Sequence, residues 1–387
     1  MAVLSSTGTS QELGGAQTPA LVLDRGKLLA NCARMQDRCR ALGVQLRPHM
    51  KTLKSLEVAR QALQSPDGPI AVATLNEARY FADRGLSDIQ YAVCISPDKL
   101  AQAASILQRA PRFSFFLDSV EVARSVVEFC RASGSRLRVW IEIDSGEHRT
   151  GMDYRDPQFL EAGRLLADPA VVLEGVATHG GHSYQADTVE RVREIAEEER
   201  SAVTNAAGVL RQAGIRCARV SAGSTPTAVH AASAAGLTEL RAGVYMAGDL
   251  FQVAVGSLSL ADVAVTVLAT VISHSRARNQ IVVDAGGLAL SKDRSTAAGP
   301  GPDMGYGLIL DVAGEPVGQD ITVTGVHQEH GEIRAVTSLP FAKLPIGAKV
   351  RIIPNHVCMT AAMYDRYLVV DGSGRVIDLW ERTNGWS

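Results

Sequence analysis

Residues 44–63 read VQLRPHMKTLKSLEVARQAL, a strand-like segment followed at once by a helix-like one. The first part, 44–51, has the length of a short strand. The second part, 55–63, repeats apolar residues at the three- and four-residue spacing of one helix face. A strand that leads into a helix is the repeating unit of parallel α/β folds. The stretch therefore predicts one βα unit of such a fold.

Seven further strand-like segments follow, and each leads into helix-length sequence that ends at a glycine or small polar residue. They are PIAVATL (69–75), DIQYAVCIS (88–96), RFSFFLDS (112–119), RLRVWIEIDSG (136–146), VVLEGVATHGG (171–181), RVSAGST (219–225) and ELRAGVYM (239–246). Eight βα units in succession predict a (β/α)₈ barrel of the TIM type.

The sequence changes character after residue 260, where strand-like segments follow one another without helices and are separated by Gly, Asp, Asn and Pro turns. This pattern predicts an all-β domain. The fold class is therefore α/β, with a barrel over residues 18–255. A C-terminal β domain over residues 256–387 would include the N-terminal segment 1–17.

Composition and charge exclude several classes of protein. The 387 residues carry 39 Lys and Arg against 41 Asp and Glu, so the net charge is close to zero. A charge balance of this kind does not indicate a nucleic-acid or membrane partner. The first 17 residues lack the apolar core of a secretory signal, and the apolar run 260–272 is interrupted by Asp262. The six cysteines show no framework spacing, which is typical of reduced thiols. We expect a cytoplasmic protein without nucleic-acid or membrane partners.

The first predicted strand ends with Arg47, His49 and Lys51 on one face, because side chains two residues apart in a strand point the same way. The carboxyl ends of barrel strands carry the chemistry in this fold, and buried ionisable groups are costly outside a polar pocket. A solvated strand end is one interpretation. The other is a lysine whose amine is desolvated enough to be neutral and to form a Schiff base.

The seventh strand ends with Gly223, Ser224 and Thr225, and the eighth with Gly243 and Tyr245. Glycine lets backbone N–H groups approach a phosphate, hydroxyls donate to its oxygens, and the loops after these two strands commonly bind phosphate. Such a turn is equally an ordinary connection. Together with a reactive lysine, it favours a phosphorylated aldehyde cofactor.

His356 and Cys358 are expected on a strand of the β domain, where residues i and i+2 share a side at about 6.5–7 Å. An imidazole and a thiolate at that spacing can hold one metal ion, although an HxC pair is common by chance. With two protein ligands the ion would keep open positions, so it would be catalytic. Zinc suits these donors best, and manganese, cobalt or magnesium are substitutes.

Nine motifs in this order resemble the alanine-racemase-like, fold-type III pyridoxal-phosphate enzymes. Within them the chain is similar to the D-serine dehydratase and D-threonine aldolase group, and most of all to D-threo-3-hydroxyaspartate dehydratases. The resemblance runs from about residue 18 to the WERTNGW ending. The motifs are TPALVLD, RPHMKT, IDSGEHRTGM, THGGHSY, GSTPT, ELRAGVY, VDAGG, QEHG and PNHVC.

The resemblance implies roles for individual residues. Lys51 would hold pyridoxal 5'-phosphate as a Schiff base, and Arg149 would face its phenolic oxygen. Gly223, Ser224, Thr225 and Gly243 would bind the phosphate, and Tyr184 and Tyr245 would line the pyridine pocket. His356 and Cys358 match the zinc pair of the dehydratases, whereas the aldolases usually carry Asp at the second ligand position.

The resemblance also implies an activity, which is elimination of water from a 3-hydroxy-D-amino acid to give a 2-oxo acid and ammonia. D-Serine, D-threonine and D-threo-3-hydroxyaspartate are candidate substrates, and a homodimer is expected. For hydroxyaspartate, a cation would have to bind the second carboxylate; the candidates are Arg47, His182, Lys292 and Arg294. The alternatives are a D-threonine-type aldolase and a non-catalytic pyridoxal-phosphate carrier.

Overall fold

The structure is a computed structural model, which describes residues 11–318, 321–335 and 337–386. It divides into two compact units. The β unit contains the described residues up to Ala30, Ala247–Ala254 and Leu258–Arg382, and the barrel unit contains Asn31–Met246, Val255–Ser257 and the residues after Arg382. The predicted ranges 18–255 and 256–387 differ from this division chiefly in residues 18–30, and part of the predicted segment 1–17 lies outside the described residues.

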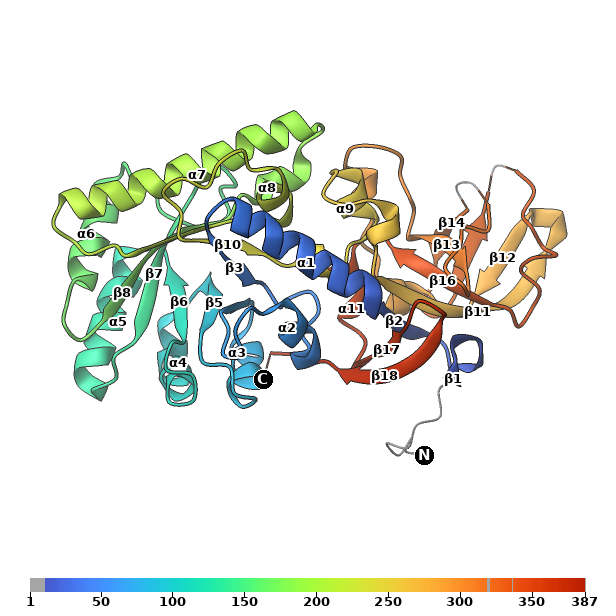
Figure 1. Cartoon of the computed structure of the whole chain (residues 1–387), viewed down its shortest axis with the longest axis horizontal. Helices are drawn as coiled ribbons and strands as arrows, with labels where there is room; N and C mark the ends of the chain where they lie inside the picture. Colours follow the sequence, from blue (N-terminus) through green and yellow to red (C-terminus); the bar gives the residue numbers. More distant parts are fainter. Residues whose placement is uncertain (1–10, 319–320, 336, 387) are drawn as a thin grey trace. The chain divides into compact units, whose positions relative to one another are not determined.

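Eight parallel strands form the sheet of the barrel unit (Figure 1). They are β3 (Gln45–Pro48), β4 (Ile70–Val72), β5 (Ile89–Cys94), β6 (Ser114–Leu117), β7 (Arg138–Ile143), β8 (Val172–Thr178), β9 (Arg219–Ala222) and β10 (Glu239–Ala242). The sheet order is β3-β10-β9-β8-β7-β6-β5-β4. A parallel bridge between His49 and Ala71 joins its two edges. The predicted α/β barrel of the TIM type is therefore confirmed.

Helices follow these strands and cover the outside of the sheet (Figure 1). They are α2 (Leu56–Ala62), α3 (Leu75–Ala82), α4 (Leu100–Leu107), α5 (Val120–Ser133), α6 (Pro157–Leu166), α7 (Val189–Gln212) and α8 (Thr225–His230); α1 (Arg25–Ala41) precedes β3. Hydroxyl side chains start several of them, as Ser119 and Thr188 do by accepting the amides of Val122 and Arg191.

A network of buried charges occupies the interior of the barrel. The guanidinium of Arg47, 1% exposed, donates to both carboxylate oxygens of Glu239, at 2.9 and 3.0 Å, and to Asp88 at 2.7 Å. Despite burial, the charge of Arg47 holds the pKa of Glu239 at about 2, so the carboxylate is ionised. The expectation that Arg47 could bind a substrate carboxylate is therefore wrong, because two carboxylates of the chain already occupy it.

The β unit is built on a ten-stranded, mostly antiparallel sheet, drawn partly in orange and red in Figure 1. Its strands are β1 (Gln11–Glu12), β2 (Ala20–Asp24), β11 (Val265–Ser275), β12 (Gln280–Val283), β13 (Gly307–Asp311), β14 (Thr322–Val326), β15 (Gly331–Arg334), β16 (Lys349–Pro354), β17 (Arg366–Val370) and β18 (Arg375–Glu381). Its helices are α9 (Leu250–Ala254), α10 (Gly287–Leu290) and α11 (Val357–Ala361). An extra pairing of β11 with β16 closes six of the strands into a barrel. The predicted β domain is therefore confirmed, although it also carries these short helices.

The N-terminal strand β2 belongs to this sheet and not to the α/β barrel. It pairs with β11 in antiparallel fashion and with β17 in parallel fashion. Leu21, Val22 and Leu23 of β2 are at most 1% exposed. Backbone pairing on both edges of β2 and burial of its apolar side chains explain why this strand is part of the β unit.

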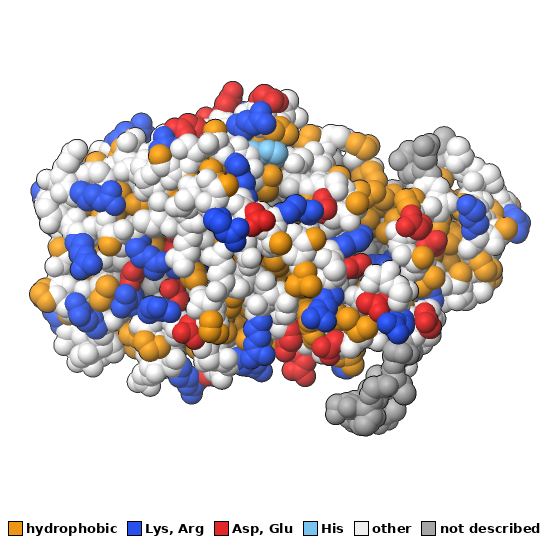
Figure 2. All heavy atoms as spheres, viewed as in Figure 1, with side chains coloured by type: hydrophobic (Ala, Val, Ile, Leu, Met, Phe, Trp, Pro, Cys, Tyr) orange, Lys and Arg blue, Asp and Glu red, His pale blue; other side chains and the backbone are white. Residues whose placement is uncertain are grey.

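The surface carries both signs of charge. On the face that Figure 2 shows, Lys and Arg side chains are interspersed with Asp and Glu, and neither sign forms a continuous area. The six cysteines are free thiols. Among the described residues, every helix is too short or too polar to cross a membrane.

Candidate functional site

Lys51 lies just beyond the carboxyl end of β3. The strand end is fixed by the amide of His49, which donates to Ala242 of β10 at 2.7 Å, and by that of Met50, which donates to Ala71 of β4 at 2.8 Å. The side chain of Lys51 is exposed, so the predicted desolvation by burial is wrong for this chain as described. Its amine forms no ion pair with any described residue. A carboxylate beside the amine would stabilise its protonated form, which cannot react with an aldehyde. An amine without such a partner is available to react.

Basic side chains gather around Lys51 at what we call the barrel mouth, defined by Lys51, His49, His179, Arg149 and Arg241. Burial and then the charge of Lys51 lower the pKa of His179 to about 3, although its hydrogen bond to Gly223 acts the other way. Burial and the charges of Lys51 and Arg241 also lower the pKa of His49. The two imidazoles are therefore neutral near pH 7, and the excess positive charge suits an anionic ligand.

The turn after β9 holds three of the predicted phosphate residues. Gly223 has φ of +129°, and a Cβ there would lie 2.4 Å from the carbonyl oxygen of Arg241, so only glycine fits between β9 and β10. Ser224 caps α8 and its Oγ lies 2.9 Å from Oγ of Ser183. The amides of Gly223 and Ser224 already donate within the protein, to Glu199 and Thr227, so a phosphate would need other donors of this turn.

The turn after β10 meets the turn after β9. A Cβ on Gly243 would lie 2.5 Å from the carbonyl oxygen of His49, and the amide of Tyr245 donates to Oγ1 of Thr225 at 3.3 Å. The phenol of Tyr245 is buried, finds no hydrogen-bond partner in the described part of the chain, and lies near the thiols of Cys32 and Cys39 on α1. The structure therefore brings Gly223, Thr225, Gly243 and the backbone of Tyr245 together, but directs the Tyr245 ring toward α1.

Tyr184 and Arg149 reach the same mouth from two other loops. Tyr184 lies in the short 3₁₀ helix Gly181–Gln185 after β8, and its ring centroid is 6.5 Å from that of His179. Arg149 follows β7, is exposed, and pairs with Glu147 at 3.3 Å. Its charge contributes to the low pKa of His179, which places it within electrostatic reach of the mouth.

One residue of this region, Glu199, was not identified from the sequence. Glu199 on α7 is 2% exposed and accepts the amides of Gly180 and Gly223. In the sequence it is one of an acidic run, which suggests a solvated helix face. The available signal was its position on the apolar stripe of α7, in line with Ile195 and Val203.

His356 and Cys358 lie in the β unit, but not on a strand as predicted. Strand β16 ends at Pro354, His356 is the N-cap of α11, and Cys358 lies in the first turn of that helix. The buried carboxylate of Asp249 accepts the amide of Val357 at 2.9 Å, and this contact from a distant segment starts the helix. The two side chains are nevertheless close enough to be hydrogen-bonded to each other.

Asp293 orients the His356 ring. Its Oδ2 lies 2.7 Å from Nδ1 of His356, and the hydrogen bonds to Asp293 and Cys358 outweigh burial and raise the pKa of His356 to about 11. A carboxylate on one ring nitrogen is the usual support for a metal-binding histidine, because it leaves the other nitrogen for the ion. Among the described residues, no cluster of three or more His, Cys, Asp or Glu side chains has the arrangement of a metal site.

The remaining candidate cations for a substrate carboxylate are also placed. His182 lies 3.6 Å from Glu198, and Arg294 pairs with Asp303. Lys292 has no ion-pair partner among the described residues. Lys292 is therefore the one of the four that is not already opposite a carboxylate.

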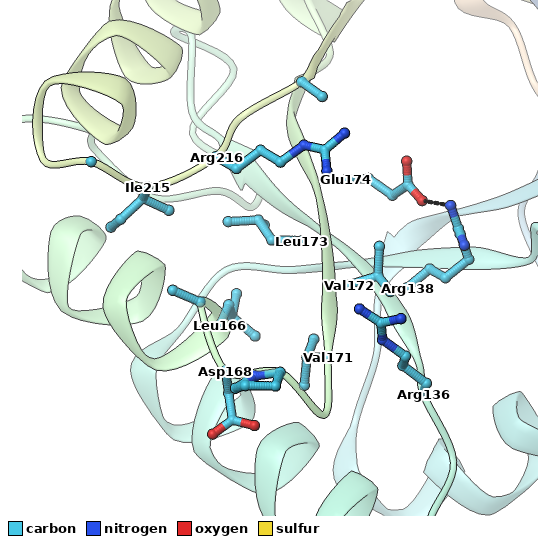
Figure 3. Close-up of a pocket in the computed structure, with 14 residues that line it drawn as sticks. Arg136, Arg138, Leu166, Asp168, Val171, Val172, Leu173, Glu174, Ile215 and Arg216 are labelled. Atoms are coloured by element: carbon cyan, nitrogen blue, oxygen red, sulfur yellow. Dashed lines mark ion pairs between the residues drawn. The ribbon is translucent and has the colours of Figure 1, made fainter.

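A pocket of about 500 Å³ lies at the other end of the barrel, where strands β7, β8 and β9 begin (Figure 3). Arg136, Arg138 and Arg216 point into it, and Glu174 pairs with Arg138. Because parallel strands all run in one direction, this pocket is remote from the barrel mouth. It is therefore not the candidate site.

Two family models match successive parts of the chain. The family model described as alanine racemase, N-terminal domain, matches residues 23–250, and that described as putative serine dehydratase domain matches residues 264–370. D-Threo-3-hydroxyaspartate dehydratase of Delftia sp. is 43% identical, covering 95% of this chain and 98% of its own. D-Serine dehydratase of Dictyostelium discoideum is 30% identical (97% and 99%), and D-threonine aldolase of Arthrobacter sp. is 31% identical (95% and 93%).

The solved structure of the Delftia dehydratase superposes with a TM-score of 0.93 at 42% identity, covering 97% of this chain and 100% of that one. A cysteine-to-alanine variant of a D-threo-3-hydroxyaspartate dehydratase, solved in a metal-free form, gives the same TM-score.

Proposed function

The chain belongs to the alanine-racemase-like family that joins an alanine racemase N-terminal domain to a serine dehydratase domain, and we propose on this premise that it is a pyridoxal-phosphate- and metal-dependent lyase. It would eliminate water from a 3-hydroxy-D-amino acid, with D-threo-3-hydroxyaspartate, D-serine and D-threonine as candidate substrates. The products would be a 2-oxo acid and ammonia.

The observation that carries this proposal is the barrel mouth, where the amine of Lys51 has no ion-pair partner among the described residues and stands among basic groups. The donors fit pyridoxal phosphate, which is anionic and needs a free amine. Lys51 would hold its aldehyde carbon, Arg149 would face its phenolic oxygen, and Tyr184 would line the ring. Gly223, Ser224, Thr225 and Gly243 would surround the phosphate, and Tyr245 would act by positioning Thr225, whose Oγ1 accepts its amide. When bound, this cofactor withdraws electrons from the substrate α-carbon and so acidifies its hydrogen.

Lys51 is also the best proton acceptor at the mouth. A guanidinium does not act as a base in proteins, and the low pKa of His179 makes its imidazole a weak one. Nδ1 of His49 already accepts the amide of Lys51 at 3.3 Å. We therefore assign removal of the α-proton to Nζ of Lys51.

In the β unit, His356 and Cys358 would hold a divalent cation, with zinc preferred over manganese or magnesium. Its chemistry would be that of a Lewis acid for the departing hydroxide. The residues of the chain contribute position: Asp293 fixes the ring of His356, and Asp249 fixes the turn that carries Cys358. The resemblance associates Cys358, rather than Asp, with dehydration.

Product analysis tests the proposal. The full-length protein, supplied with pyridoxal phosphate and Zn²⁺, is incubated with each of the three D-amino acids and with the L-enantiomers as controls. We expect ammonia and the 2-oxo acid in equal amounts from a D-substrate only. Glycine and an aldehyde would establish the aldolase alternative, and bound cofactor without any turnover would establish the carrier alternative; either result overturns the proposal.

We further propose that the chain acts as a cytoplasmic homodimer, as is typical of fold-type III enzymes. Light scattering on the purified holoprotein should give twice the chain mass. A monomer with full activity would contradict the dimer.

A further inference from the structure

Glu199 is a buried carboxylate without a direct basic partner among the described residues. It is 2% exposed, and its Oε1 accepts the amide of Gly180 at 2.6 Å and that of Gly223 at 2.8 Å. Burial raises its pKa, while hydrogen bonds from Thr227 and from the two amides lower it. Burying a carboxylate is costly unless hydrogen bonds compensate. The arrangement therefore points to a use for this side chain.

The two amides come from different loops of the barrel mouth. Gly180 follows β8 and Gly223 follows β9. Two further contacts join the same loops, since Nδ1 of His179 lies 2.9 Å from the carbonyl oxygen of Gly223 and Oγ of Ser183 lies 2.9 Å from Oγ of Ser224. A single oxygen of Glu199 thus ties both loops to α7.

We infer that Glu199 is a positioning residue. It fixes the spacing of the loops after β8 and β9, and so shapes the site that would bind the cofactor phosphate. This inference rests on the proposed function, because the loop after β9 is the one assigned to the phosphate. Glu199 holds the amide of Gly223 from the side of α7. The next two residues are also fixed, since Oγ of Ser224 contacts Ser183 and Thr227 and Oγ1 of Thr225 accepts the amide of Tyr245.

Substitutions at Glu199 can distinguish the role of its oxygen as a hydrogen-bond acceptor from the role of its negative charge. In Glu199→Gln the amide oxygen can still accept both backbone amides, and the new NH₂ group can donate to the hydroxyl of Thr227. In Glu199→Ala both amides lose their acceptor, and in Glu199→Asp the carboxylate is one methylene too short to reach them. Glu194→Ala is the matched control, because Glu194 lies on the same helix and its side chain is 64% exposed.

The test measures two quantities on the full-length variants after the cofactor has been removed. The first is the dissociation constant of added pyridoxal phosphate, followed by absorbance. The second is hydrogen exchange of the peptides that contain Gly180 and Gly223, and thermal unfolding shows whether each variant is folded. We expect Glu199→Ala and Glu199→Asp to weaken cofactor binding at least about ten-fold and to speed exchange at both loops. Glu199→Gln should stay within about three-fold of the parent protein on the same scale.

The possible outcomes are distinct. A purely structural role would lower the unfolding temperature of Glu199→Ala but leave the dissociation constant of its folded fraction unchanged, which overturns the inference while the proposed function stands. A Glu199→Asp variant that behaves like the parent protein overturns it as well. If the parent protein binds no pyridoxal phosphate, the proposed function fails and the inference falls with it. If Glu199→Ala does not fold, the contrast between Glu199→Gln and Glu199→Asp decides.

Discussion

The barrel unit contains two groups of charged side chains that are arranged in opposite ways. In its interior, Arg47 pairs with Glu239 and Asp88 at hydrogen-bond distance, and Arg219 also pairs with Glu239. At the barrel mouth, Lys51 forms no ion pair with a described residue, and the histidines beside it have low pKa values. Charges that are paired within the chain support the fold, whereas charges left without a partner are available to a ligand. Substitutions in the two groups should therefore have different consequences.

Lys51→Ala should have the largest effect and should affect function alone. Because Lys51 is both the cofactor attachment and the base, the rate of elimination should fall at least about 10⁴-fold, and the visible absorbance of the bound cofactor should disappear. The free energy of unfolding should change by less than about 0.5 kcal/mol, since the side chain is exposed. Lys99→Ala, also exposed in the barrel unit, is the control and should retain the absorbance. An unchanged absorbance band in Lys51→Ala would remove Lys51 from the site.

Glu239→Ala should do the reverse and affect stability first. Removing it leaves Arg47 buried with only Asp88 as a charged partner, so we expect a loss of about 3–5 kcal/mol of unfolding free energy in urea titration. Glu194→Ala on the surface should cost less than about 0.5 kcal/mol. If Glu239→Ala were as stable as the parent protein, the distinction between the interior and the mouth would be lost.

Asp293→Asn extends the comparison to the β unit, where a paired charge supports a ligand site. The amide cannot hold the His356 ring as the carboxylate does, so metal affinity should fall about ten- to a hundred-fold in a competition titration with a chelator. Asp303→Asn weakens the pair with Arg294, while the side-chain oxygen that remains can still accept the amide of Gly305, so this variant should keep the parent affinity. Equal affinities in both variants would mean that Asp293 serves the fold and not the metal.

The smallest expected effect is on the unfolding free energy at acidic pH. The pKa of Glu239 lies near 2 in the folded protein and near 4.5 in the unfolded one, so its stabilising contribution is present above pH 4.5 and is lost as the pH falls toward 2. In that window the unfolding free energy should decline less steeply for Glu239→Gln than for the parent protein, by at most about 1.4 kcal/mol per pH unit. Parallel curves would show that this carboxylate does not titrate with folding.

The sequence predicts the eight barrel strands well, because strand and helix periodicities are local properties of the chain. It also indicates Lys51, since a strand end is local too. Prediction from the sequence fails where contacts between distant segments determine the local structure. Asp249, far from α11 in the chain, starts that helix and removes His356 and Cys358 from the predicted strand. Arg47 is occupied by partners from two other strands or their loops, and Glu199 shows its role only when the loops after β8 and β9 are brought together.

Strand β2 has a consequence for synthesis on the ribosome. In β2, Leu23 pairs with Val265 of β11 and with Val369 of β17. The ribosome makes β2 before the barrel unit, and it makes β11 and β17 after the barrel unit. At the usual rate of translation, β2 waits roughly ten seconds to a minute before β11 emerges. During that time Leu21, Val22 and Leu23 lack both strands with which they pair, although residues 31–246 of the barrel unit have already been made. A chaperone that covers the first segment of the nascent chain should therefore raise the yield of folded protein more than one that acts after release.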